Sequence, residues 1–123
     1  MMVRDYEEVV EEMQDRIHKA MEYEKLNDIE KCNQYCEEAV RLFHFGTYSY
    51  ERLIKNYIKT KDWKNALRIC NMAIDRANRS EKLKKENKPN IGYMGTPLHW
   101  GDFPDYAKRR KEFILKKLKE EGQ

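Results

Sequence analysis

Residues 50–75 read YERLIKNYIKTKDWKNALRICNMAID, and this stretch decides the fold of the chain. Apolar side chains recur at steps of three and four on both sides of Lys61 and Asp62, which is the spacing of two amphipathic helices joined by a tight turn. The pattern therefore predicts a helical hairpin. Its expected core consists of Ile54, Ile58, Leu67, Ile69, Cys70 and Ile74.

The same hairpin pattern occurs once earlier in the chain. Moving the sequence by 34 residues places Tyr23 on Tyr57 and Cys36 on Cys70. Successive helices pack closely only where small side chains stand at their crossings. That role is expected of Ala20, Ala39, Ala66 and Ala73.

A period of 34 residues with this pattern resembles the tetratricopeptide repeat, whose consensus has a large aromatic residue, a Leu, a Tyr and two small Ala residues at fixed offsets. The resemblance implies an all-α fold in which antiparallel helical hairpins stack as a short solenoid. It also implies that the first helices of the hairpins line a concave groove. In the second copy the consensus places are filled by Tyr50, Leu53, Tyr57, Trp63, Ala66 and Ala73.

Two aspartates stand at corresponding places before the second helix of each hairpin. Asp28 and Asp62 can each accept hydrogen bonds from free backbone N–H groups and meet the positive end of the helix dipole. Both are therefore interpreted as N-caps rather than as catalytic carboxylates.

The chain of 123 residues is expected to form a single domain over 1–123. Asp102, followed by Pro104 and Asp105, is a start signal for a last helix that would cover the exposed edge of the second hairpin. The stretch 81–88 is charged and can prolong the preceding helix. The expected order is a first hairpin with an N-terminal extension (3–44), a second hairpin (47–80), a charged and aromatic insert (81–103) and a capping helix (104–120).

Charge is distributed unevenly along the chain. The formal net charge is +3, but residues 1–40 carry a net charge of −7 and residues 41–123 one of +10. This polarity can orient a partner, favour head-to-tail self-association or draw the two ends of the chain together, and the sequence leaves these three open. No apolar run approaches the roughly 20 residues needed to span a bilayer, and the acidic N-terminus lacks signal-peptide character. A cytoplasmic protein without membrane contact is therefore expected.

Metal binding and catalysis are both disfavoured by the pattern. Cys32 and Cys36 share a helix face, with Cys70 expected nearby, but the repeat register makes all three small core residues rather than zinc ligands. No nucleophile elbow, zinc-protease motif or phosphate-cradling glycine loop is present. His99 with Asp102 and Tyr106 is too weak a set to define an active site. The chain is expected to be no enzyme and to use no metal or cofactor.

A binding role is favoured instead, in the groove that the resemblance implies. The family members that hold a peptide carboxylate use Lys and Asn where this chain has Ile17 and Met21, so that activity is not transferred. The expected function is a non-catalytic protein-interaction module, an adaptor or scaffold, that binds a peptide or helix. The residues expected to contact it are Ile17, Met21, Tyr48, Glu51, Lys55, Ile58 and Lys59, with Gln14, Glu24 and Lys25 on the same face.

The aromatic insert is a second candidate contact surface. Connections of this length in compact helical domains are commonly functional or disordered, and the aromatic content argues against disorder. Its side chains either present themselves to the partner or cover the core, and both readings stay open. The residues concerned are Tyr93, His99, Trp100 and Phe103.

Nucleic acid is the alternative partner. The run Lys108, Arg109, Arg110 and Lys111 can contact phosphates, but basic residues on a capping helix are usually its solvated face. The nearly balanced total charge and the acidic N-terminal half make a nucleic-acid-associated accessory protein the second hypothesis.

Overall fold

The computed structural model describes residues 6–42, 47–85 and 103–122, and within these ranges it contains five α-helices and no strand. Helices that are adjacent in the sequence pack against each other, from the first pair to the last. The predicted all-α fold of stacked helical hairpins is confirmed in this sense. The helices are α1 (Tyr6–Lys25), α2 (Ile29–Arg41), α3 (Tyr48–Lys59), α4 (Trp63–Lys85) and α5 (Phe103–Glu120).

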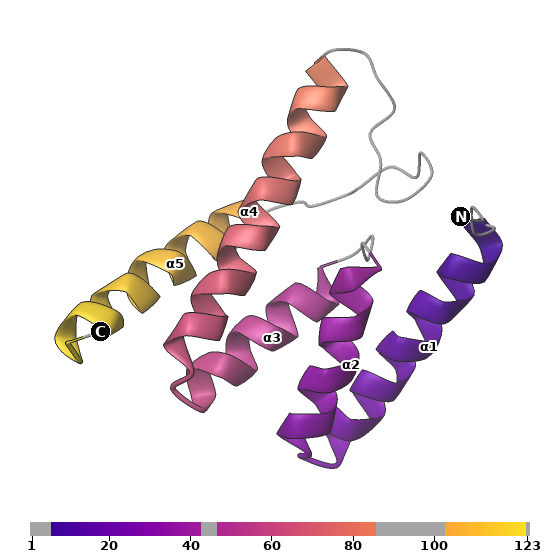
Figure 1. The fold of residues 1–123 in the computed structure, drawn as a ribbon, viewed down its shortest axis with the longest axis horizontal. Helices are drawn as coiled ribbons and strands as arrows, with labels where there is room; N and C mark the ends of the chain where they lie inside the picture. The colour runs from indigo at the N-terminus through magenta and orange to yellow at the C-terminus, as the bar shows by residue number, and fades with distance from the viewer. Residues whose placement is uncertain (1–5, 43–46, 86–102, 123) are drawn as a thin grey trace.

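The helices succeed one another through the molecule in chain order. Figure 1 shows α1 at one end, the α2 and α3 helices between, and α5 beside α4 at the other end. Among the described residues, no helix is both long and apolar enough to cross a lipid bilayer.

The two hairpins turn in the same way, 34 residues apart. Asn27 and Lys61 have backbone φ angles of 57° and 59°, in the left-handed region. In each turn the next residue donates its N–H across six residues, Asp28 to the Tyr23 carbonyl at 2.9 Å and Asp62 to the Tyr57 carbonyl at 2.8 Å. This is the Schellman arrangement that closes a helix C-terminus. The sequence repeat is therefore also a repeat of backbone geometry.

Both predicted N-caps are confirmed. The Asp28 carboxylate accepts a hydrogen bond from the Lys31 N–H at 3.1 Å, and the Asp62 carboxylate accepts one from the Asn65 N–H at 3.3 Å. Each satisfies a backbone donor that the first turn of a helix leaves free. Thr47, by contrast, stands at the N-cap of α3 without a side-chain cap bond.

Replacing Lys61 with glycine is expected to stabilise the protein by about 0.5–1 kcal/mol, because a left-handed φ strains any residue that has a Cβ. The gain is less than the full strain, since glycine also makes the unfolded chain more flexible. Urea unfolding followed by circular dichroism measures the change. Lys64→Gly, inside the regular helix α4, is the matched control and should lower stability by a similar amount. A loss in both variants would contradict the role given to the turn.

The core is built from side chains of all five helices. Ala20, Ala66 and Ala73 are fully or almost fully buried within it, as the predicted close crossings require, and Ala39 is buried as well. Of the predicted core residues, Ile54, Ile69 and Cys70 are fully buried, while Ile58, Leu67 and Ile74 are half-buried against the cluster.

Two element boundaries differ from the prediction. α4 continues to Lys85 rather than ending near 80, since residues 81–85 (EKLKK) consist of good helix formers. α5 begins at Phe103, one residue before the expected 104. The rest of the insert, 86–102, lies outside the described residues.

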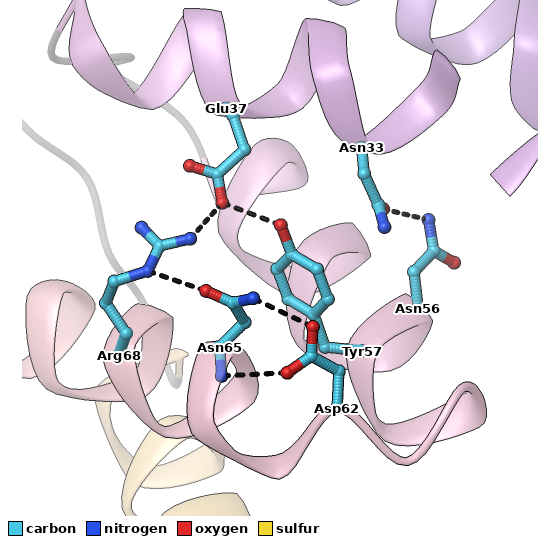
Figure 2. Close-up of polar contacts among 7 residues, drawn as sticks. All are labelled: Asn33, Glu37, Asn56, Tyr57, Asp62, Asn65 and Arg68. Atoms are coloured by element: carbon cyan, nitrogen blue, oxygen red, sulfur yellow. Dashed lines mark hydrogen bonds and ion pairs between the residues drawn. The ribbon is translucent and has the colours of Figure 1, made fainter. Parts of the chain in front are cut away.

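A seam of polar side chains fixes α3 between α2 and α4 (Figure 2). One oxygen of Glu37 on α2 accepts a hydrogen bond from the Tyr57 hydroxyl at 2.9 Å and also pairs with Arg68 on α4. Arg68 Nε in turn donates to the side-chain oxygen of Asn65 at 3.1 Å, and Asn65 bonds Asp62 at 2.8 Å. Burial, together with the hydrogen bond to Glu37, raises the pKa of Tyr57, so its hydroxyl stays a donor at neutral pH. These hydrogen bonds therefore fix how α2, α3 and α4 are placed along one another.

Candidate functional site

α1 and α3, the first helices of the two hairpins, are linked by the carboxylate of Glu24. This group accepts a hydrogen bond from the Tyr48 hydroxyl at 2.6 Å and forms an ion pair with Arg52 Nε at 3.1 Å. Burial, with the bond to Glu24, raises the pKa of Tyr48, which therefore remains protonated and able to donate. Side chains of the two helices therefore meet at Glu24, and Tyr48 is one of the predicted contact residues.

A cavity of about 110 Å³ opens where the C-terminal end of α1 and the start of α2 approach α3. It is bordered by three cationic side chains and one carboxylate. Arg52, Lys55 and Lys59 follow a spacing of three and four residues, so one face of α3 points all three toward the cavity. The complete lining is Glu24, Asn27, Ile29, Cys32, Arg52, Lys55, Asn56 and Lys59.

The three cations around this cavity are not equally engaged. Arg52 is paired with Glu24 across the helices, and exposed Lys55 is paired with Glu51 on its own helix, with a distance of 2.7 Å from Nζ to the carboxylate oxygen. Lys59 is exposed and forms no ion pair within the described residues. A ligand anion entering the cavity would therefore find Lys59 available and Lys55 exchangeable, because an exposed pair on one helix contributes only about 0.3–0.5 kcal/mol.

Polar and thiol groups lie on the inner side of the cavity. Asn56 Nδ2 donates to the Asn33 side-chain oxygen at 2.8 Å and approaches the Cys32 sulfur at 3.7 Å.

The hydrogen bond from Cys36 lowers the pKa of Cys32 against the opposing effect of burial, and the same bond raises the pKa of Cys36. Burial raises the pKa of Cys70 to about 11. Cys36 and Cys70 are therefore neutral core thiols at physiological pH.

The predicted contact residues differ in exposure, and of them only Lys55 and Lys59 border the cavity. Met21 is 38% exposed, Lys55 and Lys59 are exposed, and Ile58 is half-buried because it packs against the core. Ile17, Tyr48 and Glu51 are half-buried. The sequence interpretation missed Arg52 and Asn56 as cavity residues, although their helical spacing with Lys59 was a usable signal.

Of the predicted insert contacts, Tyr93, His99 and Trp100 lie outside the described residues. Phe103 is described, and of the two roles left open for it, it covers the core. It is the first residue of α5 and is buried, with its ring centroid 6.3 Å from that of Tyr50 and 5.6 Å from that of Tyr106. An aromatic ring that fills the space between α3 and α5 is not available to a partner.

The basic run on α5 is divided between surface and packing. Lys108 and Arg109 are exposed, whereas Arg110 and Lys111 are half-buried. The Arg110 guanidinium lies over the rings of Tyr106 and Phe113, at 5.6 and 5.8 Å from their centroids. Arg110 is therefore packed on aromatic rings of its own helix, whereas Lys108 and Arg109 face solvent.

Metal-ligating side chains are dispersed in the described part of the chain. Nowhere in residues 6–42, 47–85 and 103–122 do three His, Cys, Asp or Glu side chains gather closely enough to hold a metal ion. The three cysteines, Cys32, Cys36 and Cys70, are buried and not joined in disulfides.

Comparison with known proteins gives one partial likeness. No protein-family model matches the chain, and no solved structure matches it significantly. The chain is similar to Protein DIA2 of Saccharomyces cerevisiae, with 30% identity over 69 residues. The similarity covers 56% of this chain but 9% of the yeast protein. The chain thus spans less than a tenth of that relative's length, and the likeness is one between segments.

Proposed function

We propose that this chain is a non-catalytic protein-interaction module of tetratricopeptide-like architecture, an adaptor or scaffold of the cytoplasm. Its ligand is a short peptide or a helix that lies along the face shared by α1 and α3. The observation that carries the proposal is the cavity beside Arg52, Lys55 and Lys59. Met21 is exposed on α1, three residues before the cavity residue Glu24.

The chemistry of this face supports a ligand with both acidic and apolar side chains. Lys59 and Lys55 provide positive charge at the cavity, which attracts a carboxylate and disfavours basic segments. Met21 provides flexible apolar surface that adapts to an anchor residue. Glu24 is already paired with Arg52 and accepts a hydrogen bond from Tyr48, so its negative charge is partly offset and repels an incoming carboxylate less.

Short random-sequence peptides displayed on phage provide the probe for this proposal. Selection on the immobilised chain is expected to enrich peptides that carry Asp or Glu beside an apolar residue. The double variant Lys55→Glu/Lys59→Glu should bind the selected peptides about tenfold more weakly or worse, because it replaces attraction with repulsion at the cavity. Fluorescence anisotropy of a labelled selected peptide measures the affinity.

The matched control reverses two exposed cations on α4, in the variant Arg79→Glu/Lys82→Glu. This control changes the net charge equally but should leave peptide affinity within about twofold, since distant surface charges are screened. If the selected peptides bound Lys55→Glu/Lys59→Glu as tightly as the native chain, the cavity would be rejected as the binding site. Failure to enrich any peptide would reject the proposed function itself.

A further inference from the structure

α1 carries an acidic stripe on the face turned away from the rest of the protein. Glu8, Glu11, Asp15 and Glu22 are exposed and follow one another at steps of three, four and seven residues, which places them in one row along the helix. Met13 and Ala20, on the opposite side, are buried. Over its whole length α1 contains seven acidic and three basic residues.

The acidic stripe is only partly neutralised within the protein. Asp15 pairs with Arg16 at 2.7 Å and with Lys19 at 3.3 Å. Glu8, Glu11 and Glu22 form no ion pair within the described residues. Three carboxylates in a row thus lack a cationic partner in this part of the chain.

α5 carries the opposite charge on its own outward face. Lys108, Arg109, Lys116 and Lys119 are exposed, and on the other side Ala107 and Ile114 are fully buried. None of these four cations forms an ion pair within the described residues. Glu112 is the one acidic residue between Lys108 and Lys119, so this face has a clear positive excess.

The two charged faces stand at opposite ends of the stack. α1 packs chiefly against α2 and α5 chiefly against α4, and Figure 1 shows α2, α3 and α4 between them. The helices of one molecule therefore cannot bring these faces together. A second molecule in the same orientation would bring its α5 to the α1 of the first.

We propose that copies of this chain associate head to tail, with the acidic face of α1 on one copy against the basic face of α5 on the next. The occupant is a second copy because each face supplies the charge that the other lacks. Such an interface is heterologous, so it leaves one free face of each kind and produces open chains rather than closed dimers. Since its contacts are exposed ion pairs, the association is weak and weakens further as salt rises.

Charge reversal with cross-mixing tests this pairing on the full chain. The variant Glu8→Lys/Glu11→Lys/Glu22→Lys and the variant Lys108→Glu/Lys116→Glu/Lys119→Glu should each self-associate at least about tenfold more weakly than the native chain at low salt. An equal mixture of the two variants should associate again, because a basic α1 then meets an acidic α5. Sedimentation velocity over a concentration series measures the assembly state, and circular dichroism confirms that each variant is folded.

Two control variants distinguish this interface from the proposed peptide site at the α3 cavity. Lys55→Glu/Lys59→Glu and Arg79→Glu/Lys82→Glu should both assemble like the native chain, because neither pair lies on α1 or α5. A native chain that stays monomeric at low salt and high concentration would overturn the proposal. So would two folded variants whose mixture fails to associate. A monomeric native chain whose α5 cations bind a random-sequence DNA oligonucleotide would overturn it in favour of nucleic acid at the same face.

Discussion

Replacing Tyr50 with alanine is expected to lower the free energy of unfolding by about 3–5 kcal/mol, the range found when a buried aromatic side chain is truncated. Tyr50 is fully buried on α3, and its ring packs against that of Phe103 at the start of α5. Its truncation would therefore leave a cavity between elements that are about 50 residues apart in sequence. Urea unfolding followed by circular dichroism should show a single transition at lower denaturant concentration.

Tyr50→Phe distinguishes the contribution of the ring to stability from that of its hydroxyl. Arg76 donates a hydrogen bond to the Tyr50 hydroxyl and another to the Val40 carbonyl at 2.8 Å. Loss of the hydroxyl should cost about 0.5–1.5 kcal/mol, because the bond to Val40 remains and the ring still fills its space. If Tyr50→Ala destabilised the protein no more than Tyr50→Phe, the ring would not be the centre of the core.

Truncation of Ile114 to alanine is expected to cost about 2–5 kcal/mol, the cost of deleting buried aliphatic atoms at a site that relaxes only in part. Ile114 is fully buried in the core cluster, on the side of α5 that packs against α4. The prediction tests whether α5 is an integral part of the fold. The same urea titration measures the loss, as a lower midpoint with an unchanged dependence of unfolding free energy on urea concentration.

Leu115 provides the matched control for Ile114, since it is the next residue on the same helix and is 46% exposed. Leu115→Ala should change stability by no more than about 0.5 kcal/mol, as exposed substitutions usually do. Equal losses in the two variants would mean that α5 does not pack as described. A separate early transition in Ile114→Ala would show that α5 unfolds independently of the hairpins.

Much of the local architecture was predictable because it depends on neighbours in sequence. The 34-residue repeat, the small residues Ala66 and Ala73 and the caps Asp28 and Asp62 follow from helical spacing and from the chemistry of helix ends. The repeat also aligns the two left-handed turn residues, Asn27 and Lys61, although neither is the glycine that usually marks such a turn.

The candidate site was predictable only in part. The predicted contact residues Lys55 and Lys59 border the cavity, but the cavity also depends on Glu24, which binds Tyr48 and Arg52 from another hairpin. Nothing in the sequence around Glu24 indicates that its carboxylate will contact residues 24 and 28 positions later. For the same reason, Phe103 looked like part of an aromatic insert when its ring in fact fills a space beside Tyr50.

The sequence by itself thus determined the helices, their turns, their repeat and the opposite charges of the two ends, because periodicity, capping and composition act over a few residues. Only the tertiary structure decided which polar groups pair across helices, where the cavity lies and which aromatic rings are buried. Those outcomes depend on how three or four helices meet at once, and a small change in crossing geometry would give the same side chains different partners.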